Sequence, residues 1–334
     1  MTPNSLLDLQ SPRDVNRLVG GFFNIDKPAG WTSHDVVAKI RGLLRMKRVG
    51  HLGTLDPDAT GVLPICFEKA TKLAAYLTDH DKEYEAVLRL GEETETEDAS
   101  GKVTRTVPVP TQLQSEAGQT TVRAAMDAFI GPYMQRPPMY SAVKIKGVPL
   151  YKTARSGKVI PRASRPVEIQ SITFLGMQEN DIAFRVSCSK GTYIRTLCSD
   201  IGNKLGVGGH LRSIRRTRSG VFRLEQAIDI TAFTELCKKG EWTKAAYPLN
   251  TGLDHLSSLW VKTAYVQRLL NGVQIGFEGL EKWEPFNTGA ALRFLDRDHR
   301  LLALGHALRP SEDIPSDTRS VEVPFKVKTI LRDR

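Results

Sequence analysis

Hydrophobic and polar residues alternate in two segments of the chain, and this period of two predicts two half-buried β-strands. The segments are residues 83–90 and 182–188, in which every second side chain is apolar. A third strand-like segment, residues 167–174, loses its apolar phase between Ile169 and Ile172. That slip predicts a β-bulge.

Apolar residues recur at helical spacing in three other segments. Residues 36–44 follow Thr32 and Ser33, whose hydroxyl groups can cap a helix N-terminus. Residues 122–129 and 194–205 show the same spacing, and Gly206 closes the last of these helices. Because helices and strands are mixed without regular alternation, we expect an α+β fold on a largely antiparallel mixed sheet.

The chain changes character after an apparent linker at residues 247–253. One helical segment, residues 261–271, precedes three short strand-like segments separated by turn signals, and these are residues 289–295, 301–308 and 321–330. We therefore expect an N-terminal extension over residues 1–20, a first domain over 21–250, and a small, mainly β domain over 254–334.

Charge is unevenly distributed along the chain. Residues 133–166 hold eight Lys or Arg and no acid, and residues 185–223 hold nine Lys or Arg against Asp200 alone. Residues 78–98, in contrast, hold nine acids against two bases. Such segregation is typical of proteins that bind nucleic acid, although a basic surface that is merely solvated would show it too.

Composition sets further bounds. Of the 334 residues, 40% are hydrophobic and 25% are charged, as expected of an ordered protein. The net charge is +10. No apolar run is long enough to cross a membrane and no signal peptide is present, so we expect a cytoplasmic protein. The four cysteines lack paired spacing, and we interpret them as buried thiols with no metal site.

The densest chemical signal is the segment GHLGTLDPDATGVLP at residues 50–64, which we expect to form a shaped loop. Pro57 biases Asp56 away from helical geometry, so the carboxylate is presented from an extended or turn conformation. A carboxylate held in this way can act as a nucleophile or a base. Taken alone, the segment favours an aspartate that only caps a turn, as Asp before Pro commonly does.

Other motifs follow in a fixed order along the chain. They are DKP at 26–28, GWTS at 30–33, DKEY at 81–84, QRPPMYSA at 135–142, CSKGTYIRT at 188–196, GGHL at 208–211 and IRR at 214–216. Together with residues 50–64, this collinear series resembles the bacterial tRNA pseudouridine synthases of the TruB family, over about residues 21–222. One match would be weak, whereas the whole series is specific.

The resemblance implies roles for particular residues. It implies that Asp56 is catalytic, that Tyr84 contacts the target base, and that Arg195 pairs with the catalytic carboxylate. It also implies substrate contacts at His51, Tyr193 and Ile214. Further substrate contacts are expected at the basic residues Lys27, Lys144, Arg155, Arg215 and Arg216. Ile214 departs from the family pattern, which commonly has leucine at that position.

The implied reaction converts one uridine to pseudouridine in the T loop of tRNA, at position 55, through base flipping. Isomerisation breaks the N1–C1′ bond and joins C5 to C1′ with no redox change, so we expect no cofactor and no metal. The basic stretch 133–166 is expected to be a flap that closes on RNA, and the C-terminal domain to be PUA-like and to bind tRNA. One chain carries all the motifs, so a monomer suffices and no obligatory protein partner is expected.

Two alternatives stay open from the sequence. The chain could be a related synthase that acts on another RNA, or an RNA-binding or tRNA-folding protein in which catalysis is secondary. The presence together of Asp56, Tyr84 and Arg195 favours an active enzyme. Singly, each of these residues also fits an ordinary structural role.

Overall fold

The structure is a computed structural model that describes residues 20–78, 80–141, 144–145, 148–150, 160–313 and 324–332. The expected N-terminal extension therefore lies outside the described residues except for Gly20. Much of the expected flap, including Arg155, lies outside them as well.

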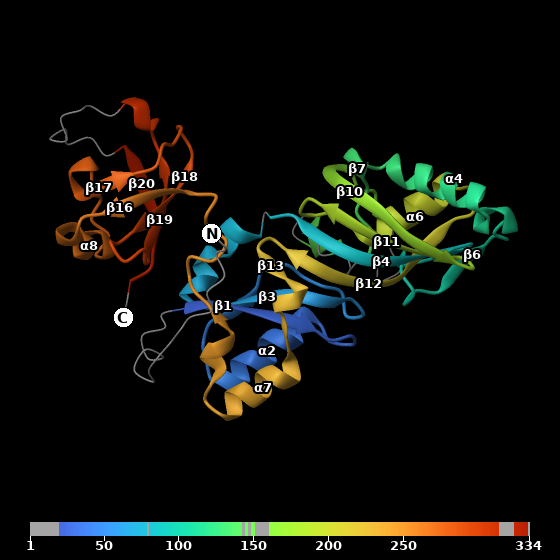
Figure 1. Ribbon diagram of the computed structural model, residues 1–334, viewed down its shortest axis with the longest axis horizontal. Helices are drawn as coiled ribbons and strands as arrows, with labels where there is room; N and C mark the ends of the chain where they lie inside the picture. The colour runs from blue at the N-terminus through green and yellow to red at the C-terminus, as the bar shows by residue number, and fades with distance from the viewer. Residues whose placement is uncertain are drawn as a thin grey trace.

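The largest sheet in the described part of the chain has eleven strands (Figure 1). Its main path runs β14-β1-β3-β12-β4-β11-β10-β7, with β13, β15 and β2 paired at its sides. Only the β1–β14 and β3–β12 pairs are parallel, which confirms the predicted α+β class with a largely antiparallel mixed sheet. The strands are β1 Gly20–Lys27, β2 Val49–His51, β3 Thr60–Glu68, β4 Lys82–Leu90, β7 Gly131–Gln135, β10 Arg165–Gln178, β11 Asp181–Cys188, β12 Gly209–Ser219, β13 Phe222–Arg223, β14 Ile228–Asp229 and β15 Ala246–Tyr247.

Helices cover two separate parts of this sheet (Figure 1). Val36 and Ile40 of α2 (Ser33–Leu44) pack with Phe233 of α7 (Ile230–Lys238) on the β1–β3 part. Apolar residues of α4 (Glu116–Asp127) and α6 (Ile194–Lys204) pack on β4, β10 and β11. Burial of these apolar faces is the main stabilising term of the fold.

Shorter elements complete this part of the chain. Two small hairpins are formed by β5 Glu92–Thr94 with β6 Val103–Thr106 and by β8 Lys144–Ile145 with β9 Val148–Pro149. The helix α3 (Ala74–Leu77) and the 3-10 helices η1 Lys69–Leu73, η2 Thr111–Gln114, η3 Leu224–Gln226 and η4 Trp242–Ala245 connect strands.

Most of the predicted elements are confirmed. Strands β4, β11 and β10 cover the three predicted segments, and β10 shifts register against β11 between Ile169 and Ser171, where the phase slip predicted a bulge. The expectation of a single loop over residues 50–64 is wrong at both ends, because residues 50–51 belong to β2. Residues 60–64 belong to β3, a central strand that is buried along nearly its whole length.

The residues after the expected linker form a second sheet of five strands in the order β17-β16-β18-β19-β20. Its elements are β16 Ser257–Val261, α8 Thr263–Leu270, η5 Phe277–Gly279, β17 Leu280–Trp283, β18 Ala291–Leu295, β19 Leu301–Ala307, η6 Ser311–Asp313 and β20 Phe325–Ile330. A small β sheet at the C-terminal end was predicted, although strands β16 and β17 were not.

The two sheets share one hydrophobic cluster. Leu304 of β19 and Leu331 are buried together with Phe22 of β1 and Leu73 of η1. Polar contacts add to this packing, since Lys69 Nζ donates to the backbone oxygen of Leu331 (3.1 Å) and Lys72 Nζ to that of Ile330 (3.0 Å). The C-terminal sheet is therefore packed against the large sheet rather than tethered to it.

Candidate active site

Asp56 lies in the short connection between β2 and β3. The hydroxyl of Ser33, at the start of α2, accepts a hydrogen bond from Leu55 N (2.8 Å) and lies 3.1 Å from Leu55 O. The carbonyl of Asp56 accepts from Ala59 N at 3.1 Å, which closes a turn. Asp56 is thus both a turn residue, as the simpler interpretation of the sequence had it, and a carboxylate in a fixed position.

Lys27 holds the residue that follows Asp56. Its side chain is fully buried, and its ammonium donates to the carbonyls of Pro57 (2.9 Å), Pro28 (2.9 Å) and Trp31 (2.6 Å). Burial lowers the pKa of Lys27 to about 8, against the opposing effect of the charges of Asp58 and Asp56. We expected Lys27 to contact substrate, but all three of its donor hydrogens can be satisfied by these protein carbonyls.

Arg216 of β12 holds the other side of the same loop. Only 1% of the residue is exposed, and its guanidinium donates to the carbonyls of Val62 (2.7 Å), Gly53 (3.1 Å) and Thr54 (3.4 Å). The backbone of β12 passes so close that a Cβ added at Gly61 would lie 2.2 Å from the Arg216 oxygen. Arg216, also expected to bind substrate, therefore supports the loop from within the protein.

The predicted partner of Asp56 is confirmed by distance. Arg195 Nε lies 3.2 Å from Asp56 Oδ2, although 138 positions separate the two residues in the chain. The side chain of Arg195 is only 8% exposed, whereas that of Asp56 is 54% exposed. A buried cation is thus paired with a carboxylate that remains accessible to a substrate.

Arg195 is held by three further acceptors. Its Nη2 donates to the carbonyl of Tyr140 (2.9 Å), and its Nη1 to the carbonyl of Thr96 and to Asp98 Oδ2, both at 3.3 Å. Asp98 was missed in the sequence, where it is the last acid of the acidic stretch 78–98. The only signal in the sequence was the excess of acids over bases in residues 78–98. That excess does not distinguish Asp98 from the other acids of the stretch.

The charges around Asp56 shift its pKa. Partial burial raises the pKa of the Asp56 carboxyl, the charge of Arg195 opposes this rise, and the charge of Asp98 adds to it. A carboxylate with a raised pKa is a stronger base and nucleophile than a fully solvated one. Arg195 keeps the ionised form available.

Tyr84 of β4 reaches the same site. It is half-buried and packs against two of the hydrophobic clusters of the large sheet, as does Ile214 of β12. Burial raises the pKa of Tyr84, a hydrogen bond and the positive charge of Arg216 oppose the shift, and the charge of Asp56 adds to it. The neutral phenol and Ile214 provide an apolar surface near the carboxylate.

Tyr193 is the residue directly before α6 and lies near Arg195 and Asp56. The side-chain amide of Gln135, which is buried, donates to Tyr193 O (3.0 Å) and accepts from Tyr193 N (2.8 Å). Burial raises the pKa of Tyr193, and the charge of Arg195 opposes the rise. Gln135 is a second residue that the sequence did not reveal as part of the site.

His51 ends strand β2 close to the Asp56 loop. Burial, together with the charges of His34 and Arg216, lowers the pKa of His51 to about 4. Its Nδ1 accepts from Gly53 N at 3.3 Å, so the neutral ring carries its proton on Nε2. The ring of His34 lies edge-on to it, with centroids 5.6 Å apart.

The remaining expected contacts differ in position. Arg215 of β12 is partly exposed, and its Nη2 lies 2.6 Å from Oδ2 of Asp26, near the end of β1. Lys144 starts the two-residue strand β8, and its side chain lies outside the described part of the chain, as does the whole of Arg155. The structure therefore gathers Asp56, Arg195, Tyr84, Tyr193 and His51, and leaves these two basic residues as predictions.

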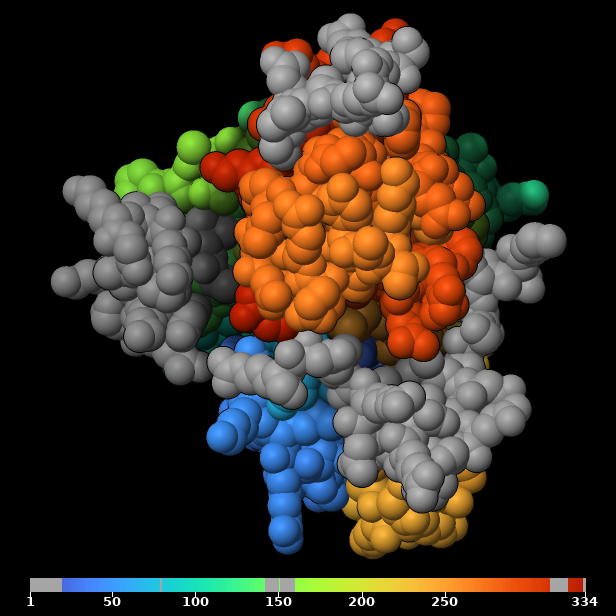
Figure 2. Space-filling view, turned by 90° about the vertical axis from the view of Figure 1, so that its left-hand side faces the viewer, coloured from blue at the N-terminus to red at the C-terminus, as the bar shows by residue number. Residues whose placement is uncertain are grey.

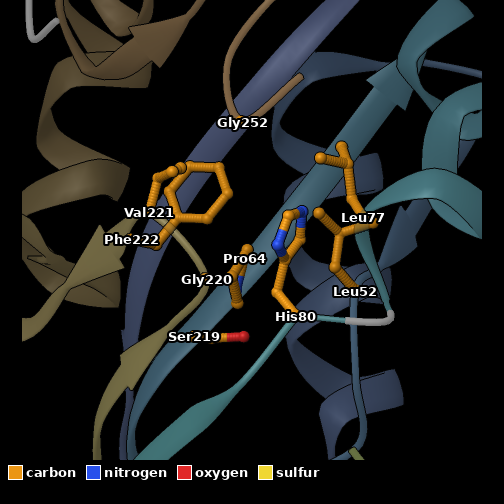
Figure 3. A pocket seen from close by; sticks show the side chains of 9 residues that line it. All are labelled: Leu52, Pro64, Leu77, His80, Ser219, Gly220, Val221, Phe222 and Gly252. Atoms are coloured by element: carbon orange, nitrogen blue, oxygen red, sulfur yellow. The ribbon is translucent and has the colours of Figure 1, made fainter. Parts of the chain in front are cut away.

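A small cavity lies away from this site (Figure 3). It is lined by residues that include Leu77, His80, Phe222 and Gly252, and its volume of about 10 Å³ is room for roughly one water molecule. None of the expected catalytic residues lines it. In the described residues, no group of three or more His, Cys, Asp or Glu is placed to hold a metal ion, and no helix is long and apolar enough to cross a membrane.

Comparisons with known proteins agree with this fold. The family described as "TruB family pseudouridylate synthase (N terminal domain)" matches residues 41–194, and "tRNA pseudouridylate synthase B C-terminal domain" matches residues 195–258. The tRNA pseudouridine synthase B of Alkaliphilus oremlandii is 47% identical over 77% of this chain and 83% of the relative. That of Burkholderia mallei is 39% identical over 89% and 93% of the two chains.

Solved structures show the same fold. A Cbf5-Nop10-Gar1 complex matches with a TM-score of 0.75 and 29% identity, covering 99% of this chain and 91% of the other. An H/ACA RNP bound to a substrate RNA containing 2′-deoxyuridine matches with a TM-score of 0.74 and 27% identity, covering 100% and 92%. The fold and these relatives thus define a pseudouridine synthase, an isomerase. Within that class, the chain belongs to the TruB family.

Proposed function

We propose that this enzyme converts a single uridine of tRNA to pseudouridine, in the T loop at position 55. The observation that carries the proposal is the ion pair between accessible Asp56 and buried Arg195, because the reaction needs a carboxylate in contact with substrate and a cation to keep it ionised. The tRNA substrate rests on the family and on the relatives at 39–47% identity.

The reaction is balanced within the uridine itself. The N1–C1′ bond breaks, the uracil turns, a C5–C1′ bond forms, and the proton lost from C5 is matched by one gained at N1. Asp56 is the group we assign to act on the detaching nucleotide, as nucleophile or base. Arg195 keeps the Asp56 carboxylate ionised. Asp98, which contacts the other side of the Arg195 guanidinium, helps to orient this ion pair.

The other side chains of the site are assigned to binding. Tyr84 and Ile214 offer a flat apolar surface for a uracil that has left the base stack. His51 presents an Nε2–H donor toward RNA, and Tyr193 borders the site beside Arg195. Lys27 and Arg216 act as positioning residues, because their donors hold the Asp56 loop instead of facing solvent.

RNA binding rests on the two basic stretches, but they contribute unequally. Within residues 185–223, Arg185 pairs with Glu85, Arg212 with Asp181 and Arg215 with Asp26, which reduces the charge available to phosphates. The flap over residues 133–166 therefore remains the main predicted clamp. One chain supplies both Asp56 and Arg195, so we propose a monomeric enzyme that acts on tRNA in the cytoplasm.

The test is to incubate the purified protein with an unmodified tRNA transcript, without added cofactor, and to map pseudouridine along the RNA. We expect conversion of one T-loop uridine and none elsewhere. Conversion only in ribosomal RNA fragments would assign the enzyme to another substrate. Tight tRNA binding with no conversion would favour a folding-assisting protein.

A further inference from the structure

The solvent-facing side of α2 carries an unusual concentration of positive charge. Val36, Val37 and Ile40 are buried against the sheet, which turns the remaining positions of the helix outward. The exposed residues Lys39 and Arg41 on the helix, Arg45 at its C-cap, and Lys47 and Arg48 just after it form what we call the α2 basic face.

Most of these cations lack a carboxylate partner. Arg48 lies 3.4 Å from Glu68, and Arg41 donates to the backbone oxygen of Val49 at 3.1 Å, which leaves the charge of Arg41 uncompensated. Within the described residues, Lys39, Arg45 and Lys47 form no ion pair at all with an acidic side chain. The repulsion among these cations is unfavourable unless an anion binds there.

On the neighbouring helix α7 and just after it, exposed lysines do form ion pairs with acidic side chains. This helix packs beside α2 (Figure 1), and its exposed Lys238 lies 2.7 Å from Glu235. Just beyond α7, Lys244 lies 2.9 Å from Glu241. Residues 33–48 hold five Lys or Arg against Asp35, whereas residues 229–244 hold three lysines against three acids.

The α2 basic face is connected to the active site through its own elements. α2 begins at Ser33, which binds Leu55 beside Asp56, and β2 returns the chain to His51. Twelve helical residues span roughly 18 Å, so the basic end of α2 lies beyond the reach of the target nucleotide itself. In Figure 2 the blue part of the chain, which contains α2, projects from the lower part of the molecule.

We propose that the α2 basic face binds backbone phosphates of the substrate RNA outside the target stem-loop. The proposal rests on the proposed function, and it adds a second contact surface to the site around Asp56. The partner is an RNA strand or duplex, because several unpaired cations without aromatic side chains between them suit a phosphate backbone and offer no base recognition.

The test compares a triple variant, Lys39→Gln/Arg45→Gln/Lys47→Gln, with the matched control Lys238→Gln/Lys239→Gln/Lys244→Gln, which removes the same charge from the end of α7 and the residues just after it. The affinities of both and of the wild type are measured for an unmodified full-length tRNA and for a hairpin of the T stem and loop only, between 50 and 200 mM salt. The salt slope is the slope of the logarithm of affinity against the logarithm of salt concentration. Loss of three phosphate contacts should lower its magnitude by about 2 to 3. The change in affinity for full-length tRNA over this salt range should then shrink roughly 20- to 40-fold.

We expect that effect in the α2 variant with full-length tRNA, and in neither the control nor the hairpin. A salt slope for full-length tRNA equal to that of the wild type would overturn the proposal, and so would an equal loss on the hairpin. Failure of the proposed function is a separate result, since it would appear as wild-type protein that forms no pseudouridine. The α2 variant could still show its binding defect in that case, and the inferred surface would stand.

Discussion

At the scale of single residues, the chemistry of Asp56 depends on groups that are distant in the sequence. Arg195 is the cation in contact with it, and Asp98 competes for the same guanidinium from the other side. Asp98 is itself fixed by Thr96 Oγ1 (2.7 Å) and Ser100 Oγ (2.6 Å). A carboxylate–guanidinium–carboxylate arrangement of this kind orients Arg195 while leaving one carboxylate open to substrate.

His51 provides a prediction on pH. Because its pKa is lowered to about 4, the unfolded chain binds more protons than the folded one between about pH 4 and the ordinary histidine value near 6.5. His51 therefore destabilises the folded protein progressively as the pH falls through that window. An NMR titration should show its ring neutral, with the proton on Nε2, at pH 6.

Replacement of His34 tests the cause of that shift. His34→Ala removes a nearby charge that lowers the pKa of His51, so the pKa of His51 should rise toward its ordinary value. His34→Phe, which keeps an edge-on ring without a charge, should raise it as well. If neither variant moves the His51 titration, the charge of His34 does not contribute to the lowered pKa of His51.

At the scale of secondary-structure elements, the site is built by loops that are tied to neighbouring elements by buried side chains. Ser33 of α2, Lys27 of β1 and Arg216 of β12 each bond to backbone groups of the loop that carries Asp56. Gln135 of β7 does the same for Tyr193. The loop conformation is thus set from three sides.

Ser33→Ala tests this support. The change leaves the backbone groups of Leu55 without their buried partner, which should lower the free energy of unfolding by about 1–3 kcal/mol. It should lower kcat more than it raises KM, since Asp56 loses its position and RNA contacts elsewhere remain. Ser171→Ala, at an exposed position of β10, is the control and should change neither chemical denaturation nor kinetics.

The sequence predicts the catalytic set better than its supports. Asp56, Tyr84 and Arg195 lie in motifs whose order could be compared with a family, and alternation predicted β4, β10 and β11. Lys27 and Arg216 look like phosphate ligands in a sequence. A sequence shows that a side chain is basic, but it does not show whether that side chain donates to RNA or to a buried carbonyl. Asp98 and Gln135 escaped notice, since their contacts join segments that are 97 and 58 positions away in the chain.

At the scale of the whole molecule, the two sheets form one packed unit. Their shared hydrophobic cluster contains residues of β1, β3 and η1 together with Leu295, Leu301 and Leu304 of the C-terminal sheet. The position of the C-terminal sheet relative to Asp56 is therefore fixed by packing. An RNA that contacts both the Asp56 site and the C-terminal sheet therefore binds two surfaces whose relative position is fixed.

Leu304→Ala tests that packing. Leu304 is fully buried, so the substitution should lower the free energy of unfolding by about 2–5 kcal/mol. Leu308→Ala, at a residue 53% exposed just after β19, should change it little. Urea denaturation of both variants checks the difference. Equal stability of the two variants would mean that the sheets do not share a core.

The most direct test of the central claim, that the Asp56 carboxylate does the chemistry, compares Asp56→Asn with Asp58→Asn. Both changes remove one charge from the same loop, but only Asp56 contacts Arg195. With tRNA labelled with tritium at uridine C5, Asp56→Asn should release label at least about 10³-fold more slowly than wild type while binding tRNA with similar affinity. Asp58→Asn should stay close to wild type. Release by Asp56→Asn at a near wild-type rate would contradict the assignment.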